Sequence, residues 1–209
     1  MTEDQLEQLC LDWFRETGWE TAYGPDLAAD GSAPERSDYR QVLLFGDLET
    51  ALRRLNPHLP ADVIEQVTEQ LRKPESLDVL VNNREFHRLL LDGVPVDYKQ
   101  DERIVHDRAL LLDFEQAGNN RFRAINQFTI EGSKGLRRPD IICFINGLPL
   151  AVLELKSPSA ENVNIWDAFN QIQTYKDEIT DLFVFNEAIV VSDGYNARVG
   201  SLTANQERF

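Results

Sequence analysis

Residues 137–158 read RRPDIICFINGLPLAVLELKSP and contain the features that decide the fold of this chain. Two short apolar runs, IICFI and LAVLEL, flank the dipeptide Asn146-Gly147. Asn-Gly between two β-prone runs is a strong short-range signal for a tight hairpin. The sequence therefore predicts two antiparallel strands, at about 140–145 and 149–156.

Charged residues stand at the ends of this predicted hairpin. Asp140 begins the first strand, and Glu154 and Lys156 lie near the end of the second. Residues two apart on a strand point to the same face, so Glu154 and Lys156 are expected side by side. Glu154 also interrupts an apolar run, where a carboxylate is costly unless it is paired or binds a metal ion. Two carboxylates and a lysine in this pattern predict a metal-dependent hydrolytic site.

Hydrolysis of a phosphodiester suits such a site, because Mg²⁺ neutralises phosphate charge and activates water. Asp140 and Glu154 would supply oxygen ligands, and the backbone carbonyl of Leu155 a third. Lys156 would orient or deprotonate the attacking water, or offset charge in the transition state. The preceding Arg137 and Arg138 would hold phosphate.

A non-catalytic interpretation of the same residues is also open. An Asp at a strand start and a Glu-x-Lys pair on a strand are common, and they would form an ion-pair network in a docking or DNA-positioning module. Metal titration separates the two, because only a catalytic site should bind Mn²⁺ or Mg²⁺ saturably.

The charge of the chain is unevenly distributed. The 209 residues carry a net charge of -15, which argues against non-specific binding of nucleic acid by the whole surface. Residues 1–120 hold 12 Lys and Arg against 25 Asp and Glu, whereas residues 121–156 hold six against three. The basic segment therefore surrounds the predicted site and suggests a local groove for an anion.

Other compositional features limit the class of protein. No apolar stretch approaches the roughly 20 residues that span a bilayer, and the acidic start lacks a signal-peptide core. A cytoplasmic protein without membrane contact is therefore expected. Cys10 and Cys143 fall in apolar patterns and are expected to be buried thiols, whereas the scattered His58, His87 and His106 are expected to be structural or on the surface.

Hydrophobic periodicity places the remaining elements. The expected order is a helix at 3–17, a short strand at 19–23, a loop at 24–38, helices at 39–55, 61–72 and 77–91, extended segments at 94–99 and 104–114, a strand at 122–130, a turn at 131–136, the central hairpin, a helix at 161–179 and a strand at 187–192. This order predicts an α/β fold with a mixed sheet of about five strands flanked by helices, and a mostly helical insertion at about 39–92.

The hairpin and its surroundings resemble a known family. Pro139-Asp140, thirteen intervening residues and Glu154-Leu155-Lys156 look like the PD-(D/E)XK nuclease motif. The longer stretch GLRRPDIICFINGLPLAVLELKSP closely resembles the N-terminal nuclease domain of the R (HsdR) subunits of type I restriction-modification enzymes. Similar stretches recur along nearly the whole chain: DWFRETGWE at 12–20, NREFHRLLLDGVPV at 83–96, DRALLLDFE at 107–115 and VVSDGYNARVGSLT at 190–203.

The resemblance implies roles for particular residues. Asp140 and Glu154 match the metal-binding acids and Lys156 the catalytic lysine. Gln171 and Tyr175 match a Gln-x-x-x-Tyr motif that supports the active site and DNA contact, and their one-turn spacing puts them on the same helix face. A further match is Glu7, an additional acid on the first helix that would join the metal ligands.

The resemblance also implies the partners of the chain. Residues 1–209 would be the Mg²⁺-dependent endonuclease domain of a type I site-specific deoxyribonuclease, with Mn²⁺ able to substitute, and would act on double-stranded DNA. In the full-length subunit an ATP-driven helicase-like motor would follow, and methylation and specificity subunits would complete the complex. Since no ATP-binding motif occurs here, the chain is expected to be an N-terminal fragment; Gly132-Ser133-Lys134-Gly135 lacks the spacing of a Walker loop.

Overall fold

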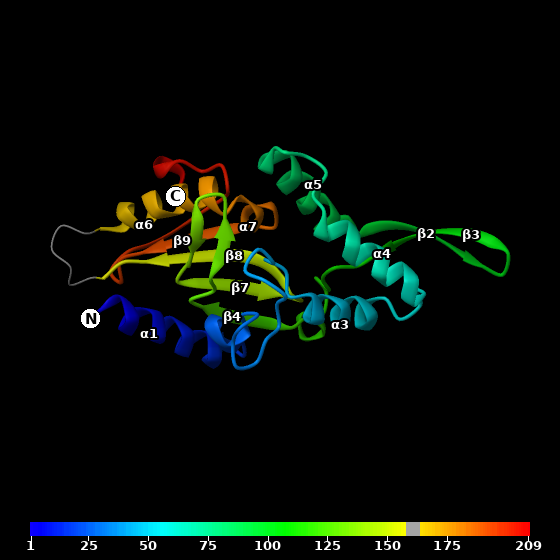
Figure 1. The fold of residues 1–209 in the computed structure, drawn as a ribbon, viewed down its shortest axis with the longest axis horizontal. Helices are drawn as coiled ribbons and strands as arrows, with labels where there is room; N and C mark the ends of the chain where they lie inside the picture. The colour runs from blue at the N-terminus through cyan, green and yellow to red at the C-terminus, as the bar shows by residue number, and fades with distance from the viewer. Residues whose placement is uncertain (158–163) are drawn as a thin grey trace.

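A six-stranded mixed sheet forms the centre of the molecule (Figure 1). Its strand order is β1-β4-β7-β8-β9-β10, in which β1 is Glu20–Tyr23, β9 is Ala188–Ser192 and β10 is Ala197–Gly200. The computed structural model describes residues 1–157 and 164–209. The predicted hairpin is β7 (Ile141–Ile145) and β8 (Leu148–Leu155), and β4 (Phe122–Asn126) lies antiparallel beside β7. The α/β class with a mixed central sheet is thus confirmed, with one strand more than the sequence predicted.

The turn of the central hairpin follows from its two residues. Asn146 and Gly147 have φ angles of 53° and 80°, and a tight hairpin turn requires positive φ at both positions. A Cβ on Gly147 would lie 2.3 Å from the carbonyl oxygen of Leu44, so only glycine fits there. The same dipeptide therefore closes the hairpin and lets the segment before α3 (Phe45–Leu55) approach it.

The two faces of the sheet are covered by different helices. Alternate side chains of the hairpin, such as Ile141 and Cys143, pack with Leu6 and Leu11 of α1 (Glu3–Glu16) on one face. The intervening side chains point to the other face and join a larger core, which includes side chains of α6 (Ile165–Glu178), the helix that follows the hairpin. Thr2 caps α1 through a capping box with Gln5.

A crossover connects β8 to the parallel strand β9 (Ala188–Ser192). It contains α6 (Ile165–Glu178) and the short α7 (Thr180–Val184). The predicted helix start at about residue 161 lies outside the described residues. The described helix begins after Asn164, whose side chain accepts a hydrogen bond from the Trp166 amide.

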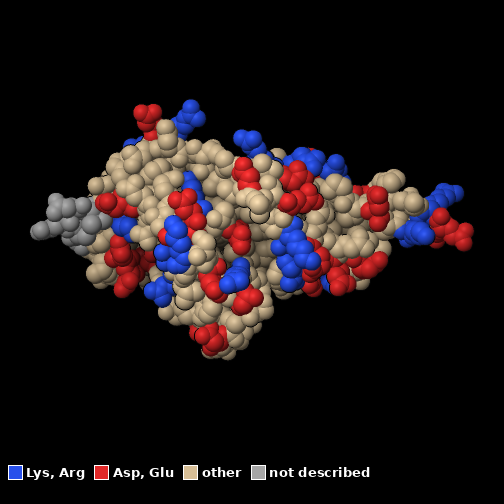
Figure 2. Space-filling model, turned by 45° about the horizontal axis from the view of Figure 1, so that its top comes forward, with Lys and Arg blue, Asp and Glu red and all other residues tan. Residues whose placement is uncertain are grey.

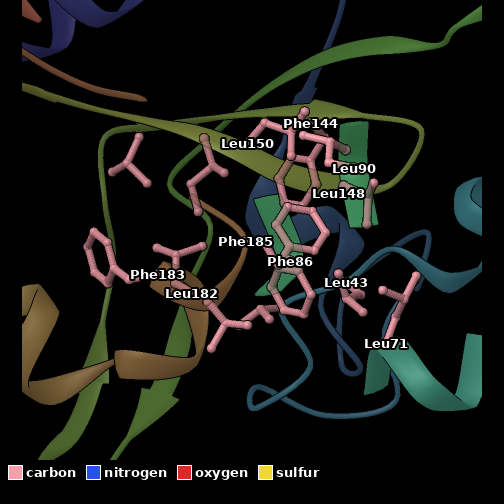
Figure 3. Close-up of a cluster of buried hydrophobic side chains, with 14 of the residues drawn as sticks. Leu43, Leu71, Phe86, Leu90, Phe144, Leu148, Leu150, Leu182, Phe183 and Phe185 are labelled. Carbon is pink, nitrogen blue, oxygen red and sulfur yellow. The ribbon is translucent and has the colours of Figure 1, made fainter. Parts of the chain in front are cut away.

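Three helices and a hairpin between β1 (Glu20–Tyr23) and β4 extend away from the sheet (Figure 1). They are α3 (Phe45–Leu55), α4 (Ala61–Arg72), α5 (Val79–Asp92) and the hairpin of β2 (Val94–Gln100) and β3 (Arg103–Ala109). Figure 3 shows Leu43, Leu71 and Phe86 packed in one cluster with Leu148 and Phe185. These helices therefore share a hydrophobic core with the sheet.

Two predicted elements begin or end elsewhere because side chains replace backbone partners. The helix expected at 39–55 starts only at Phe45, since the Asp38 carboxylate accepts hydrogen bonds from the amides of Arg40 and Gln41 and favours a turn. The extended segment expected at 104–114 ends at Ala109. Beyond it, the side-chain amide of Asn56 bonds both the N–H and the C=O of Leu110.

The prediction of a strand at 122–130 was wrong beyond Asn126, because Gln127 adopts a positive φ of 55° and interrupts the extended chain. The turn expected at 131–136 is part of a small hairpin, β5 (Ile130–Gly132) and β6 (Gly135–Arg137). The remaining elements are β1 (Glu20–Tyr23), α2 (Gly24–Leu27) within the expected loop, β10 (Ala197–Gly200), which the sequence did not predict, and 3-10 turns at Ala117–Asn119 and Gln206–Arg208.

Within the described residues, no helix combines the length and the apolar character needed to cross a membrane. Both cysteines are free; Cys143 is buried, and burial raises the pKa of its thiol to about 12. The three histidines each pair with an acid near the surface: His58 with Asp107, His87 with Glu187 and His106 with Asp97.

Candidate active site

Asp140 and Glu154 come together because of the register of the central hairpin. Ile141 pairs with Leu153, which places Asp140, just before β7, across from Glu154 near the end of β8. Oδ2 of Asp140 accepts a hydrogen bond of 2.7 Å from the amide of Leu155. The first carboxylate of the predicted motif is thus fixed directly to the strand that carries the second.

Lys156 completes the cluster. Its Nζ lies 3.0 Å from Oε1 of Glu154, as expected for side chains two residues apart on one face. The same ammonium lies 3.7 Å from Oε1 of Glu3, in the first turn of α1. The N-terminal end of this helix therefore borders the site, which agrees with the position of the N-terminus in Figure 1.

Burial strongly affects both carboxyl groups. It raises the pKa of Glu154 to about 8, and the nearby charge of Asp140 adds to that rise while Lys156 opposes it. Burial also raises the pKa of Asp140 to about 6, against the lowering effect of the Leu155 amide and of Lys156. Two acids whose charged forms are destabilised in this way occur preferentially at functional sites.

The charge of Glu154 is only partly compensated. The residue is 1% exposed, and its Oε2 has no hydrogen-bond partner within residues 1–157 and 164–209. An unsatisfied buried carboxylate oxygen is costly, and a bound cation would satisfy it.

The donor set of the site fits a hard divalent cation. Among the described residues, no three or more His, Cys, Asp and Glu side chains are grouped to hold a metal ion. Mg²⁺ does not need such a group, because it is held by one or two carboxylates and keeps several waters or phosphate oxygens. Asp140 and Glu154 meet that requirement, whereas the Leu155 carbonyl stays a predicted ligand.

Glu7 of α1 lies at the same end of the sheet. Its Oε1 accepts a hydrogen bond of 2.7 Å from Nδ2 of Asn126, and its Oε2 accepts one from the side-chain amide of Gln127. The negative charge of Glu7 is one of the causes that raise the pKa of Asp140. The structure thus places this predicted residue close enough to Asp140 for its charge to act on that carboxyl group.

Gln171 and Tyr175 project from one face of α6, as their spacing predicted. Nε2 of Gln171 donates to the Tyr175 hydroxyl at 2.8 Å, and that hydroxyl lies 3.4 Å from the carbonyl oxygen of Arg138. Burial, followed by the charge of Glu154, raises the pKa of Tyr175. This pair therefore contacts the chain just before Asp140.

The two predicted phosphate-binding arginines differ in environment. Nε of Arg137 donates to Oε2 of Glu178, a carboxylate on α6 that is nearly buried. Arg138 is exposed, and within the described parts of the chain no acid lies in ion-pair distance of its guanidinium. Only Arg138 is therefore available to an incoming anion without breaking an existing ion pair.

Three residues near the site were missed by the sequence-based prediction. Glu3 precedes Glu7 by one helical turn, so the i,i+4 spacing of two acids on the first helix was a usable signal. Asn126 and Gln127 gave no signal, because their proximity to Glu7 depends on the end of β4 and not on a motif.

A mixed sheet flanked by helices, with an Asp before one strand and Glu-x-Lys at the end of its neighbour, is consistent with a nuclease core of the PD-(D/E)XK class. The family model described as type I restriction enzyme R protein N terminus matches residues 1–208. The chain belongs to this family.

Relatives with curated names agree with the family assignment. The chain is 45% identical to the type I restriction enzyme HindI endonuclease subunit of Haemophilus influenzae, over 100% of this chain and 20% of that protein. It is 32% identical to the SauCOLORF180P endonuclease subunit of Staphylococcus aureus, over 56% of this chain and 14% of that protein. The chain thus spans at most about a fifth of the length of these relatives.

Proposed function

We propose that this chain is the endonuclease domain of a type I restriction-modification R subunit. It hydrolyses phosphodiester bonds of double-stranded DNA in a Mg²⁺-dependent reaction, after ATP-driven translocation by the rest of the subunit. Residues 1–209 form one domain in this proposal, and the insertion at about 39–92 belongs to it. Family membership and the names of the relatives support this function.

The proposal rests mainly on one observation, which is that the negative charge of the Glu154 carboxylate is only partly compensated. Its Oε1 pairs with Lys156, while its buried Oε2 lacks a partner among the described residues. In a purely structural ion-pair network, both oxygens are expected to be satisfied. A carboxylate that keeps one oxygen free beside Asp140 is instead suited to bind a cation.

Each residue then has a chemical role. Asp140 and Glu154 hold Mg²⁺, for which Mn²⁺ substitutes, and the Leu155 carbonyl is the third protein donor. When bound, the metal ion neutralises charge on the phosphate and makes water a better nucleophile. Lys156, at the rim of the cluster, orients the attacking water or offsets the charge that develops on the phosphate. Gln171 and Tyr175 support the backbone before Asp140.

The surface charge limits how this domain grips DNA. On the face shown in Figure 2, basic and acidic side chains are interspersed, in keeping with the net charge of -15. Firm binding of a polyanion needs a cluster of positive charge. The proposal therefore assigns most DNA contact to the motor of the same subunit and to the methylation and specificity subunits.

The test uses the complete restriction enzyme. Asp140→Ala, Glu154→Ala and Lys156→Ala should each abolish DNA cleavage and leave DNA-dependent ATP hydrolysis intact. Normal cleavage by all three variants would support the alternative, a docking or DNA-positioning module with the same fold. Titration of the chain with Mn²⁺ gives an independent answer, because the alternative predicts no saturable site.

A further inference from the structure

The side-chain amides at the end of β4 engage both oxygens of Glu7. Asn126 donates to Oε1, and Gln127 donates to Oε2. All three residues are at least partly buried. This fixes the direction of a carboxylate that would otherwise rotate freely on the surface of α1.

Gln127 makes the second of these hydrogen bonds from an unfavourable backbone conformation. Its φ is 55°, a region that residues with a Cβ rarely adopt and that glycine adopts freely. In a continuing strand, its side chain would point to the face opposite to that of its neighbours. The left-handed conformation instead lets Asn126 and Gln127 reach the same carboxylate.

The surroundings hold this conformation in place from two sides. The amide of Gln127 donates to the carbonyl oxygen of Asp140 at 3.0 Å. On the other side, Gly24 approaches so closely that a Cβ there would lie 2.7 Å from the carbonyl oxygen of Gln127. Strained conformations that the surroundings enforce are concentrated at functional sites.

Gln127 thus joins the two acids directly: its side chain holds Glu7, and its backbone holds Asp140. We propose that Asn126 and Gln127 are positioning residues that hold Glu7 toward Asp140, so that Glu7 would accept hydrogen bonds from water on the divalent metal ion that Asp140 and Glu154 hold. This inference rests on the proposed function. Groups outside the direct ligands commonly tune the affinity of a metal site through such hydrogen bonds.

The alternative to this positioning role is a structural one, in which the same amides serve only to fasten α1 to the sheet. Gln127→Gly separates the two roles. It removes the side-chain amide and also relieves the unfavourable backbone conformation, so the folded state should be preserved. Glu102→Gly is the matched control, because Glu102 has a similar φ of 64° at the tip of the β2–β3 hairpin, far from the site (Figure 1).

The experiment measures Mn²⁺ binding to the chain by calorimetry and its thermal unfolding in EDTA. For Gln127→Gly we expect the Kd for Mn²⁺ to rise about 10–100-fold, while the unfolding temperature stays equal or increases. Asn126→Ala should weaken Mn²⁺ binding in the same direction. Glu102→Gly should leave the Kd unchanged. In a Glu7→Gln background, Gln127→Gly should have no further effect, since it acts through Glu7.

Two results would overturn the inference, and they differ. If the unsubstituted chain binds Mn²⁺ and Gln127→Gly binds it equally well, the positioning role is wrong and the proposed function stands. If the unsubstituted chain shows no saturable Mn²⁺ binding, both the metal site of the proposed function and the inference fail. A lower unfolding temperature of Gln127→Gly together with an unchanged Kd would indicate that the amides only fasten α1.

Discussion

The Lys156 ammonium lies 3.0 Å from Oε1 of Glu154, whereas Oε2 of the same buried carboxylate has no partner among the described residues. A buried charge that is only half compensated lowers the stability of the folded protein. Keeping such a charge is expected where function requires it, because stability and activity are often in conflict. The site should therefore reveal itself through its dependence on pH and on metal ions.

The stability of the metal-free chain should fall as pH rises. The folded-state pKa of Glu154, about 8, exceeds its ordinary value of 4.5, so between these values the folded state binds a proton that the unfolded state has lost. The contribution of Glu154 to stability is therefore fully present below pH 4.5, and this contribution is lost as the pH rises to about 8. Each pH unit in this window changes the free energy of unfolding by about 1.4 kcal/mol per excess proton.

Urea denaturation in EDTA between pH 5 and pH 8 measures this dependence. Glu154→Gln should flatten the slope, because it removes the titrating group. Identical slopes for the unsubstituted chain and Glu154→Gln would show that Glu154 titrates normally.

Divalent metal should stabilise the chain more at pH 8 than at pH 6. Protons compete with the metal for Asp140 and Glu154, whose pKa values are raised to about 6 and about 8. A metal that binds only the folded state adds about 2.7 kcal/mol of stability when its concentration is 100 times the Kd.

Thermal unfolding with and without Mn²⁺ tests this expectation. Asp140→Asn should lose the stabilisation, while Asp97→Asn on the distant β2–β3 hairpin should retain it. A shift in unfolding temperature that is the same for the unsubstituted chain and Asp140→Asn would place the bound metal elsewhere.

The sequence predicted the part of the fold that local signals determine. Asn146-Gly147 specified the central hairpin, and its register then placed Asp140 opposite Glu154. The helix expected at 3–17 likewise corresponds to α1, whose start is capped by Thr2 and Gln5. In these cases the deciding residues are neighbours in sequence, so propensity and packing favour the same structure.

Errors occurred where residues distant in sequence decide the backbone. Leu110 leaves the extended conformation because its backbone N–H and C=O both form hydrogen bonds with the side-chain amide of Asn56. Gln127 ends β4 in a conformation held by Asp140 and Gly24, which the alternating pattern of 122–130 could not reveal. For the same reason, the amides that hold Glu7 were absent from the predicted site.

Asp47→Ala should destabilise the chain by about 1–3 kcal/mol, because it removes the buried partner of Arg123 and leaves that guanidinium paired with the partly exposed Glu35. Oδ2 of Asp47 on α3 lies 2.8 Å from Nη1 of Arg123 on β4, and both side chains are less than 10% exposed. This pair joins the helical insertion to the central sheet. Arg40→Ala is the control, since its ion pair with Glu131 is largely exposed and should contribute at most about 1 kcal/mol.

Urea denaturation at constant pH measures both variants. Equal and small losses for Asp47→Ala and Arg40→Ala would show that Glu35, which also pairs with Arg123, carries the interaction alone.

Arg137→Ala and Arg138→Ala should separate stability from DNA binding at adjacent positions. Arg137 pairs with the nearly buried Glu178, so its loss should destabilise the chain by about 1–3 kcal/mol. Arg138 is exposed, so its loss should change stability by less than about 0.5 kcal/mol.

If Arg138 contacts a phosphate, Arg138→Ala should also reduce the salt dependence of DNA binding by the complete subunit, by about one unit in the slope of log K against log salt concentration. Arg137→Ala should leave that slope unchanged, because its guanidinium is already held by Glu178. Unfolding of the two variants in urea and DNA binding at several KCl concentrations test both halves. A reduced slope for Arg137→Ala alone would mean that Arg137 releases Glu178 when DNA binds.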